Sequence, residues 1–490
     1  MYKESLCHKD FIDQKPFIHL FTTPRGFYFY DVNQDSIIQI TQGVYEYLSS
    51  NRTLESLSQE DRNSISRLKK EAFLAPFRVQ KIRHPDMQNL EYYLNKRAEQ
   101  LILQVTQSCN LSCSYCPYAN KTDNVLQRNH SGKCMTWETA KKSIDFFCKH
   151  SSETQTVGIS FYGGEPLLAF GIIRQSMEYA KKLFAGKDLN FHMTTNGTLF
   201  TDEIIDYFSR NVVHIAFSID GAEAVHDLNR RHTDGTGSFH QAVSSLKRVY
   251  NAFSDEARGR LSVNMVLNPE TNAEDILKLF DDPFFGEEKV SISAGLAEDD
   301  YLARKFTNSE DFVVLLEYQY FLGYLSYLGA VKNLRMPPIV RGYFANFDKL
   351  RMKYRMKSQP VPEESRTRGA CIPGQRRLFV STDGIFYPCE RVNELSEVMK
   401  IGNINDGFDY ENAGDILNFA ALTPEECRRC YAFWQCKLCA AAADAVDHFS
   451  AAKKFRQCAE SRSAAESEML NCVLIREKKT FYSKKRRAVS

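Results

Sequence analysis

The sequence lacks the features that assign a chain to the nucleic-acid-binding, exported or membrane classes. Its 63 basic and 61 acidic residues leave a formal net charge of only +2, so there is no electrostatic case for nucleic acid as the main partner. Charged residues such as Lys3 and Glu4 interrupt the first positions, so we expect a cytoplasmic protein without a signal peptide. The most membrane-like stretch, residues 312–331, contains Glu317 and Gln319. We expect a buried helix there and no membrane partner.

The chain also lacks repeats and low-complexity tracts, but it is rich in cysteine. Its 490 residues predict two to four domains. Fourteen cysteines in a chain without an export signal favour metal ligands over disulfides. Ten of them form two tight groups. Ordinary thiols are expected at the other four, Cys7, Cys134, Cys148 and Cys472.

Residues 1–80 have the pattern of a small domain. Three apolar runs joined by turn signals predict a β-meander. Two helices follow, of which the first is capped by Thr41. Residues 81–100 are predicted to link this domain to the next, with a hairpin around residues 90–94. The strands are expected at 17–21, 27–30 and 37–40, and the helices at 42–48 and 59–73.

Residues 101–299 alternate between strand and helix signals. Six strands alternating with helices predict a parallel sheet, and right-handed crossovers are expected to curl it into an open barrel. The strands are expected at 101–106, 157–162, 189–194, 212–219, 261–267 and 290–293, and the helices at 137–149, 166–183, 202–210, 239–253 and 273–280. A helical bridge (300–368), a cysteine-rich domain (369–460) and a C-terminal helix with a basic, frayed tail (461–490) are expected to follow.

The first cysteine group follows the first predicted strand directly. Cys109, Cys113 and Cys116 have the spacing C-x3-C-x2-C and supply three thiolates from one loop. A cubane iron–sulfur cluster normally takes four thiolates, so three leave one iron open for a ligand. By this spacing alone, a zinc site or unliganded cysteines remain alternatives.

Four further motifs occur where the next strands should end. Each of them alone is compatible with turn chemistry, because glycine allows positive φ and Asn or Asp bonds to its own backbone. The four motifs recur in step with the alternation of strands and helices, and this indicates that they belong to one site. They are FYGGEP at 161–166, TTNGT at 194–198, SIDG at 218–221 and HDLNR at 226–230.

With these motifs, residues 101–295 resemble the radical S-adenosylmethionine (SAM) superfamily. The resemblance implies an α/β fold with a partial (β/α)6 barrel, and an open iron that chelates SAM. For Asn196 and Asp220, a purely structural role in turns remains open. The SAM-binding residues that the resemblance implies are Tyr115, Gly163, Gly164, Glu165, Asn196, Ser218, Asp220 and Arg230.

The second cysteine group begins with Cys371, Gly384 and Cys389. It continues as Cys427-x2-Cys430-x5-Cys436-x2-Cys439 and ends at Cys458. Two structural zinc sites would need eight ligands, and the group has seven. The pattern resembles the SPASM domain, which carries auxiliary clusters, although that family has three residues, not two, between the cysteines equivalent to Cys436 and Cys439. The resemblance implies a far auxiliary cluster on Cys427, Cys430, Cys436 and Cys458, and a near one on Cys371, Cys389 and Cys439.

Together the two cysteine groups imply three [4Fe–4S] clusters. Glu390 follows Cys389 at a position where sulfatase maturases place an acidic base. A general-base role or a salt-bridged glutamate are the two interpretations of this residue.

The N-terminal meander, placed before such an enzyme, resembles a RiPP recognition element, which binds the leader of a ribosomally made precursor peptide by edge-strand pairing. The whole chain resembles a maturase of the sactipeptide and ranthipeptide type. This implies thioether crosslinking of a precursor peptide, with a flavodoxin or ferredoxin as electron donor. A SPASM oxidase, a carbon–carbon crosslinking enzyme, or a non-catalytic metal-loaded peptide-binding adaptor are the alternatives.

Overall fold

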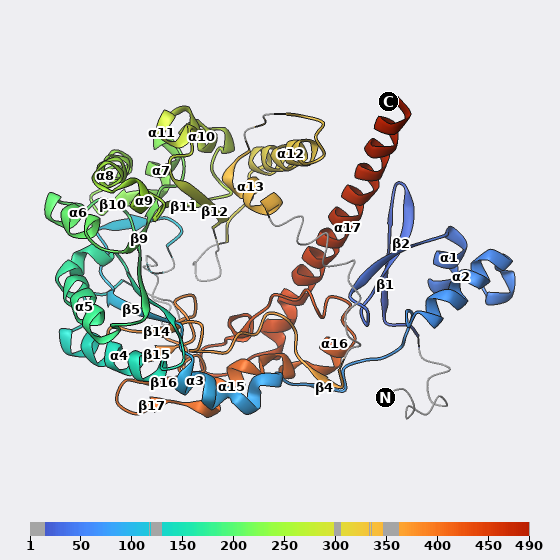
Figure 1. The fold of residues 1–490 in the computed structure, drawn as a ribbon, viewed down its shortest axis with the longest axis horizontal. Coiled ribbons are helices and arrows are strands. Elements are labelled where there is room, and N and C mark those ends of the chain that lie inside the picture. The colour runs from blue at the N-terminus through green and yellow to red at the C-terminus, as the bar shows by residue number, and fades with distance from the viewer. Residues whose placement is uncertain are drawn as a thin grey trace.

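The computed structural model describes residues 15–116, 118, 130–297, 305–332, 334, 336–345 and 362–489. A ten-stranded sheet with the order β12-β11-β9-β8-β7-β5-β14-β15-β16-β17 forms its centre (Figure 1). In these residues, no helix has both the length and the apolar character to cross a membrane.

Six strands of this sheet are parallel, as predicted. Helices cover their outer face (Figure 1), and Thr136 and Thr201 cap two of these helices by accepting backbone N–H bonds. Closure into a partial barrel stays a prediction. The strands are β5 (Gln100–Thr106), β7 (Thr156–Gly163), β8 (Asp188–Thr195), β9 (Val213–Ser218), β11 (Leu261–Leu267) and β12 (Ser291–Leu296). The covering helices are α4 (Trp137–His150), α5 (Phe170–Leu183), α6 (Asp202–Ser209) and α8 (Phe239–Ala252).

The N-terminal meander is present as predicted. Thr41 Oγ1 accepts the N–H of Val44 at 3.3 Å, which confirms the predicted helix cap. The second helix ends earlier than predicted, because Ala72 has a φ of +64° and the N–H of Phe73 turns back to Leu68 O. The antiparallel strands are β1 (Ile18–Thr23), β2 (Gly26–Asp31) and β3 (Ser36–Ile40), followed by α1 (Gln42–Leu48) and α2 (Gln59–Lys70).

The predicted hairpin around residues 90–94 is wrong. This segment forms helix α3 (Leu90–Lys96). Leu90 and Leu94, four residues apart, are both buried on the side that faces the core, and this spacing is that of one helix face. The linker also contains β4 (Lys81–Ile82), which pairs with β13 (Glu364–Ser365).

The cysteine-rich part of the chain extends the main sheet, which the sequence did not predict. Strand β14 (Leu378–Val380) runs parallel to β5, with Leu378 opposite Leu101. Three short antiparallel strands continue from it, and α15 (Tyr410–Leu417) and α16 (Pro424–Arg428) follow. These strands are β15 (Ile385–Tyr387), β16 (Gly402–Asn403) and β17 (Gly407–Phe408).

The described part of the predicted bridge contains α12 (Glu310–Tyr327) and α13 (Pro338–Ala345), and residues 346–361 lie outside the described residues. The prediction that α12 is buried is wrong, because Val314 and Phe321 are 61% and 56% exposed. The last helix, α17 (Ala451–Val489), begins before the predicted boundary at residue 461 and includes Cys458. It also includes residues 484–487, so the prediction of a frayed basic tail is wrong.

The N-terminal sheet shares a hydrophobic core with the C-terminal region. Phe21 and Tyr30 belong to the same buried cluster as Phe433 and Met469, and Figure 1 shows β1 and β2 beside α17. Trp434 Nε1 donates to Val32 O at 2.9 Å across this contact. The meander is therefore packed against the cysteine-rich region and is not a detached lobe.

The joint between β14 and β5 can be tested by substituting Phe379, which lies fully buried in β14. We expect Phe379→Ala to lower the free energy of unfolding by about 3–5 kcal/mol, because it leaves a cavity where the two parts of the sheet meet. Val212→Ala is the control, since Val212 is 43% exposed, and should cost less than about 0.5 kcal/mol. Urea titration followed by circular dichroism measures both. Equal midpoints for the two variants would contradict this joint.

Candidate functional site

The three cysteines of the first group lie together after β5. Cys113 belongs to β6 (Leu111–Cys113) and is buried, and Cys109 and Cys116 are half-buried against the same apolar cluster. Burial raises the pKa of the Cys109 thiol to about 11 and that of Cys113 to about 12, and the charges of the neighbouring thiols act in the same direction. Three buried or half-buried thiols that would have to ionise together are suited to a metal cluster, which binds thiolates and stabilises them.

A short β-ladder brings a cation to these thiols. Strand β10 (Arg230–His232) pairs with β6 so that Arg230 lies opposite Cys113. Arg230 Nη1 lies 3.9 Å from Cys113 Sγ. This ladder could not be predicted from the sequence, because each strand has only three residues.

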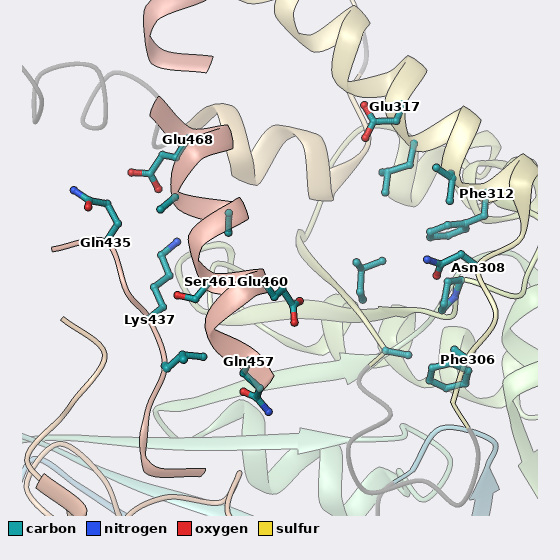
Figure 2. A pocket seen from close by; sticks show the side chains of 18 residues that line it. Phe306, Asn308, Phe312, Glu317, Gln435, Lys437, Gln457, Glu460, Ser461 and Glu468 are labelled. Atoms are coloured by element: carbon teal, nitrogen blue, oxygen red, sulfur yellow. The ribbon is translucent and has the colours of Figure 1, made fainter. Parts of the chain in front are cut away.

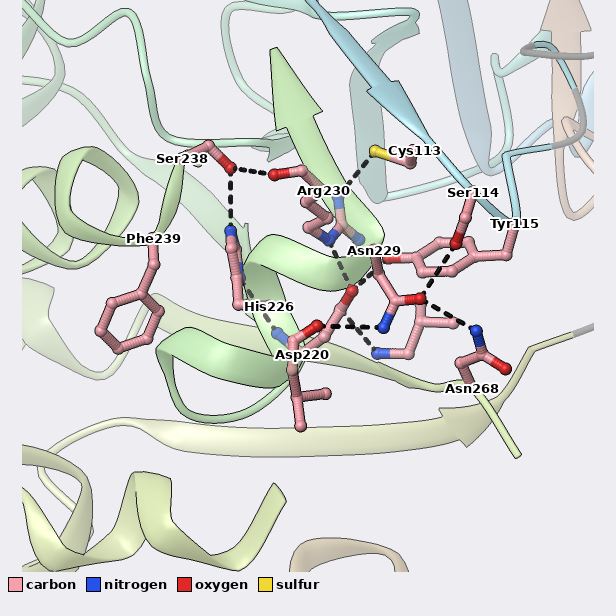
Figure 3. A network of polar contacts seen from close by, with 12 residues as sticks. Cys113, Ser114, Tyr115, Asp220, His226, Asn229, Arg230, Ser238, Phe239 and Asn268 are labelled. Carbon is pink, nitrogen blue, oxygen red and sulfur yellow. Dashed lines mark hydrogen bonds and ion pairs between the residues drawn. The ribbon is translucent and has the colours of Figure 1, made fainter. Parts of the chain in front are cut away.

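Arg230 is held by a buried ion pair with Asp220 (Figure 3). Its Nε donates to Asp220 Oδ2 at 2.8 Å, and both side chains are at least nine-tenths buried. Tyr115 also donates its hydroxyl to Asp220 Oδ2, and the N–H of Val266 donates to Asp220 Oδ1 at 3.0 Å. Burial alone would lower the pKa of Arg230, but the carboxylate of Asp220 together with Tyr115 and Cys113 outweighs this effect and raises it. The guanidinium therefore stays charged beside the thiols.

His226 supports this pair from behind and must be neutral. The backbone N–H of Asp220 donates to His226 Nδ1 at 3.4 Å, so the ring proton lies on Nε2, which is 3.0 Å from Ser238 Oγ. The Ser238 hydroxyl then donates to Arg230 O at 2.8 Å. Burial lowers the pKa of His226 to about 3. This series of hydrogen bonds fixes the backbone on both sides of the ion pair (Figure 3).

Asn229 joins three loops of the site. Its Oδ1 accepts from Ser114 Oγ and from Asn268 Nδ2, each at 2.9 Å. Its backbone carbonyl accepts the N–H of Ser114. We had not assigned Asn229, although it lies in the HDLNR motif next to Arg230. Asn268, after β11, had no sequence signal.

The glycines of the GGE motif are required by a close approach to the cysteine loop. A Cβ on Gly163, which has a φ of +145°, would lie 1.9 Å from Thr106 O, and one on Gly164 would lie 2.2 Å from Ser108 O. The N–H of Glu165 donates to the same Ser108 carbonyl at 2.9 Å. Only glycine allows this approach.

The Glu165 carboxylate is fully buried and connects two loops. It accepts the Thr195 hydroxyl at 2.8 Å and the Asn196 N–H at 2.7 Å. Burial raises its pKa, and these hydrogen bonds oppose that rise. Asn196 in turn donates to Asn110 in the cysteine loop at 2.9 Å. Glu165 and Asn196 thus have structural roles, and their contact with SAM stays a prediction.

Two further residues, Ser218 and His130, belong to this part of the structure. Ser218 is buried at the end of β9. The residues predicted for SAM thus lie in the cysteine loop, at the carboxyl ends of β7, β8 and β9, or in the motif after β9. His130, which we had not assigned, has its Nε2 3.7 Å from Cys116 Sγ and its Nδ1 2.8 Å from Gln107 O. It lies fourteen residues beyond Cys116, so spacing could not have identified it.

The four cysteines predicted for the far auxiliary cluster line one cavity: Cys427, Cys430, Cys436 and Cys458. Burial raises the pKa of Cys430 to about 11, and the charges of Cys436 and Cys427 add to this. A cubane binds each cysteine through a different iron, so its thiolates lie farther apart than the ligands of a single ion. In the described residues, no group of three His, Cys, Asp or Glu side chains has the arrangement that would hold a single metal ion.

A buried lysine borders this cavity. Lys454 is 2% exposed, and its ammonium donates to Thr423 Oγ1 at 2.7 Å, Ala420 O at 3.0 Å and Cys427 Sγ at 3.5 Å. A positive charge here would offset the negative charge of thiolates. Lys454 and Cys458 lie four residues apart on α17, a spacing that puts both on one face of the helix and that is visible in the sequence.

The three cysteines predicted for the near auxiliary cluster also lie together. Burial raises the pKa of Cys389 to about 11, and the charges of Cys371 and Cys439 act on it in the same direction. A Cβ on Gly369 would lie 2.0 Å from Leu438 O, so the chain before Cys371 runs directly beside the chain before Cys439.

Glu390 forms an ion pair with Arg377 at 2.7 Å. This is the contact expected if Glu390 is a salt-bridged glutamate. Both side chains line a cavity of ≈ 380 Å³ along the main sheet, together with His192 and His214. Burial lowers the pKa of His192 to about 4. A general-base role for Glu390 stays a prediction.

Of the four cysteines expected to be ordinary thiols, the three that the structure describes do not join these groups. Cys472 lies on α17 and is buried in the core that this helix shares with the N-terminal sheet, Cys148 packs on the main core, and Cys134 is exposed. Cys7 lies outside the described residues.

Residues 103–282 match the profile of the radical SAM superfamily. The chain is 32% identical over 152 residues to a serine-type anaerobic sulfatase-maturating enzyme of Bacteroides thetaiotaomicron, covering 30% of this chain and 36% of that protein. It is 24% identical over 349 residues to a cysteine-type anaerobic sulfatase-maturating enzyme of Clostridium perfringens, covering 69% and 87%. It is 29% identical over 175 residues to the sporulation killing factor maturation protein SkfB of Bacillus subtilis, covering 36% and 37%. The chain thus spans little more than a third of two of these relatives.

A solved structure, native anSMEcpe with bound AdoMet, has the same fold, with a TM-score of 0.55 and 21% identity, covering 76% of this chain and 98% of that one. Residues 103–282 of the chain are therefore similar to the radical SAM superfamily, and the chain is similar to maturation enzymes. This relationship implies SAM and a [4Fe–4S] cluster as cofactors.

The neutral state of His226 predicts how acid affects the site. The unfolded ring takes up a proton near its usual pKa of 6.5, and the folded ring stays neutral down to about pH 3. The stability that this neutral ring contributes is present above pH 6.5 and is lost as the pH falls. Between pH 8 and pH 5, the loss should be about 2 kcal/mol at 1.36 kcal/mol per pKa unit.

We expect His226→Gln to remove most of this acid-dependent loss, measured by urea titration at several pH values. His240→Gln is the matched control, because His240 is an exposed histidine on α8. Identical pH dependence in the wild type and His226→Gln would contradict the neutral, buried ring.

Proposed function

We propose that this protein is a radical SAM maturase that forms thioether crosslinks, from a cysteine sulfur to a carbon, within a ribosomally made precursor peptide. The observation that carries the proposal is the grouping of the ten cysteines. Three lie at the carboxyl edge of the parallel sheet, four line one cavity, and three lie close enough for the charges of Cys371 and Cys439 to act on Cys389. The relatives that mature proteins support a polypeptide substrate.

The first group fits a [4Fe–4S] cluster with one open iron, because it offers one buried and two half-buried thiols and a fixed cation. Cys109, Cys113 and Cys116 would hold the cluster, and Arg230 would provide positive charge for the carboxylate of SAM. When bound, the cluster and SAM supply a carbon radical that removes a hydrogen atom from the peptide and yields methionine and 5′-deoxyadenosine. Asp220 would keep Arg230 in position, and the buried Glu165 would fix the neighbouring loops.

The other two groups fit auxiliary clusters. Thioether formation removes two hydrogens from the peptide: one goes to 5′-deoxyadenosine, and the other leaves as a proton and an electron, which an auxiliary cluster would accept. Cys371, Cys389 and Cys439 supply only three thiolates, so one iron there would be open to a substrate thiol. Lys454 would balance the charge of the four-cysteine cluster. A flavodoxin or ferredoxin would supply the first electron.

The N-terminal meander would bind the leader of the precursor. Within the described residues, β3 pairs only with β2 and leaves an edge to which an extended peptide can add. The β1 side of the sheet lies beside α17. The β3 edge of the sheet would thus bind the leader, and the β1 edge would pack against α17. The leader would be held by a domain packed against the cysteine-rich region.

Replacing Cys109, Cys113 and Cys116 with alanine should abolish the production of 5′-deoxyadenosine, because the open iron is lost. The iron content should fall by about four of twelve irons per chain, by cubane stoichiometry. The measurements are liquid chromatography of the products and iron analysis of anaerobically reconstituted protein. Cys148→Ala serves as the control, because Cys148 lies outside all three groups, and should retain both. SAM cleavage by the triple variant would disprove the assignment of these cysteines.

Thioether formation should consume free thiols in the precursor peptide. After reaction, the peptide should lose the mass of two hydrogens and one site for alkylation by iodoacetamide for each crosslink. A SPASM oxidase or a carbon–carbon crosslinking enzyme would give the same mass loss with every thiol still alkylated. Mass spectrometry before and after alkylation thus separates the proposed reaction from these two alternatives.

A further inference from the structure

A groove runs between helices α12 and α17. Its larger part is a cavity of ≈ 810 Å³ (Figure 2), and a second cavity of ≈ 440 Å³ shares Glu317 with it. Both cavities have α12 on one side and α17 on the other. The assignment of the cysteine clusters does not depend on this groove.

The groove connects the parts of the molecule that a long peptide would have to reach. At one end its wall includes Ala297 and Phe306, which pack against the cluster of Cys109, Cys113 and Cys116. Leu438, in the same wall, directly precedes Cys439. At the other end, the second cavity reaches Thr23 and Pro24 in the turn between β1 and β2. The groove thus extends from the N-terminal sheet to the SAM-cluster cysteines.

The groove has an excess of negative charge. Glu317, Glu460 and Glu468 line the larger cavity, where Lys437 is the only basic lining residue among those described. Glu317 and Glu460 are exposed on facing helices, and Figure 2 shows them on opposite sides of the cavity. Carboxylates on both walls favour a cationic occupant.

Aromatic rings line the second cavity. Tyr320 and Tyr324 come from α12, and Tyr343 comes from α13. Burial raises the pKa of all three hydroxyls, so the rings stay uncharged. Lysine and arginine side chains bind well where aromatic faces and carboxylates occur together.

A buried amide in the groove wall has an unused acceptor. Gln435 is 5% exposed, and its Nε2 donates to Tyr30 and to Asp35 of the N-terminal sheet, each at 3.0 Å. Its Oε1 has no hydrogen-bond partner among the described residues. A buried acceptor left unpaired costs free energy, and the N–H of a peptide bound in the groove would satisfy it.

We propose that this groove binds a segment of the peptide substrate that carries lysine or arginine side chains and lies between the leader and the residue that reacts. The proposal rests on the proposed function and adds a substrate preference to it. Glu317 and Glu460 determine the preference for basic side chains, and Gln435 accepts from the peptide backbone. An extended segment suits the groove because it runs along two helices and ends at two separate sites.

The test measures binding of two fluorescein-labelled peptides to the full-length protein by fluorescence anisotropy. Both are about ten residues long, which spans about 33 Å when extended, and they differ only in carrying lysines or glutamates at the same positions. The lysine peptide should bind more tightly. The double variant Glu317→Gln/Glu460→Gln should weaken its binding about fivefold, as expected for two exposed ion pairs. High salt should remove this difference.

The matched control is Glu91→Gln/Asp415→Asn, which removes two exposed carboxylates from α3 and α15, outside the groove. It should leave the affinity for the lysine peptide unchanged. Equal weakening by both double variants, or equal affinity of the wild type for both peptides, would overturn the proposal. Neither outcome depends on radical chemistry, so the thiol-alkylation experiment still decides the proposed reaction independently.

Discussion

The arrangement of the site depends on the buried ion pair between Asp220 and Arg230. Burying two charges is unfavourable unless each is paired and hydrogen-bonded, and here Tyr115 and Val266 supply the additional bonds. The pair fixes β10 against β6 and thus sets a guanidinium beside Cys113. His226 and Asn229 hold the backbone around it, so the cysteine loop, the end of β9 and the loop after β11 are fixed relative to one another.

The three cysteine groups share one rigid frame because the main sheet does not stop at β5. Addition of β14 places the chain that leads to Cys389 in the same sheet as the chain that leads to Cys109. The N-terminal meander is attached through a shared core with α17 and the segment between Cys430 and Cys436. The proposed electron acceptor, radical source and leader-binding sheet would thus be held at fixed separations, as a reaction between bound groups requires.

The sequence predicted elements well where its periodicity was long. The six parallel strands, the meander and Thr41 as a cap were confirmed, because each depends on local patterns. The segment at residues 90–94 was mispredicted because a short apolar run fits either a helix or a hairpin. The exposure of α12 was also mispredicted, since its apolar residues surround the helix and no face could be assigned to the core.

The sequence by itself determined which residues are candidates for the chemistry: the spacing of the cysteines and the motifs at the strand ends depend on neighbours along the chain. Only the tertiary structure decided how they act together. Three features join segments that no local pattern connects. They are the ion pair of Asp220 with Arg230, the contact of Lys454 with Cys427, and the groove between α12 and α17. Such contacts depend on packing and burial, which a single sequence does not encode in any local pattern.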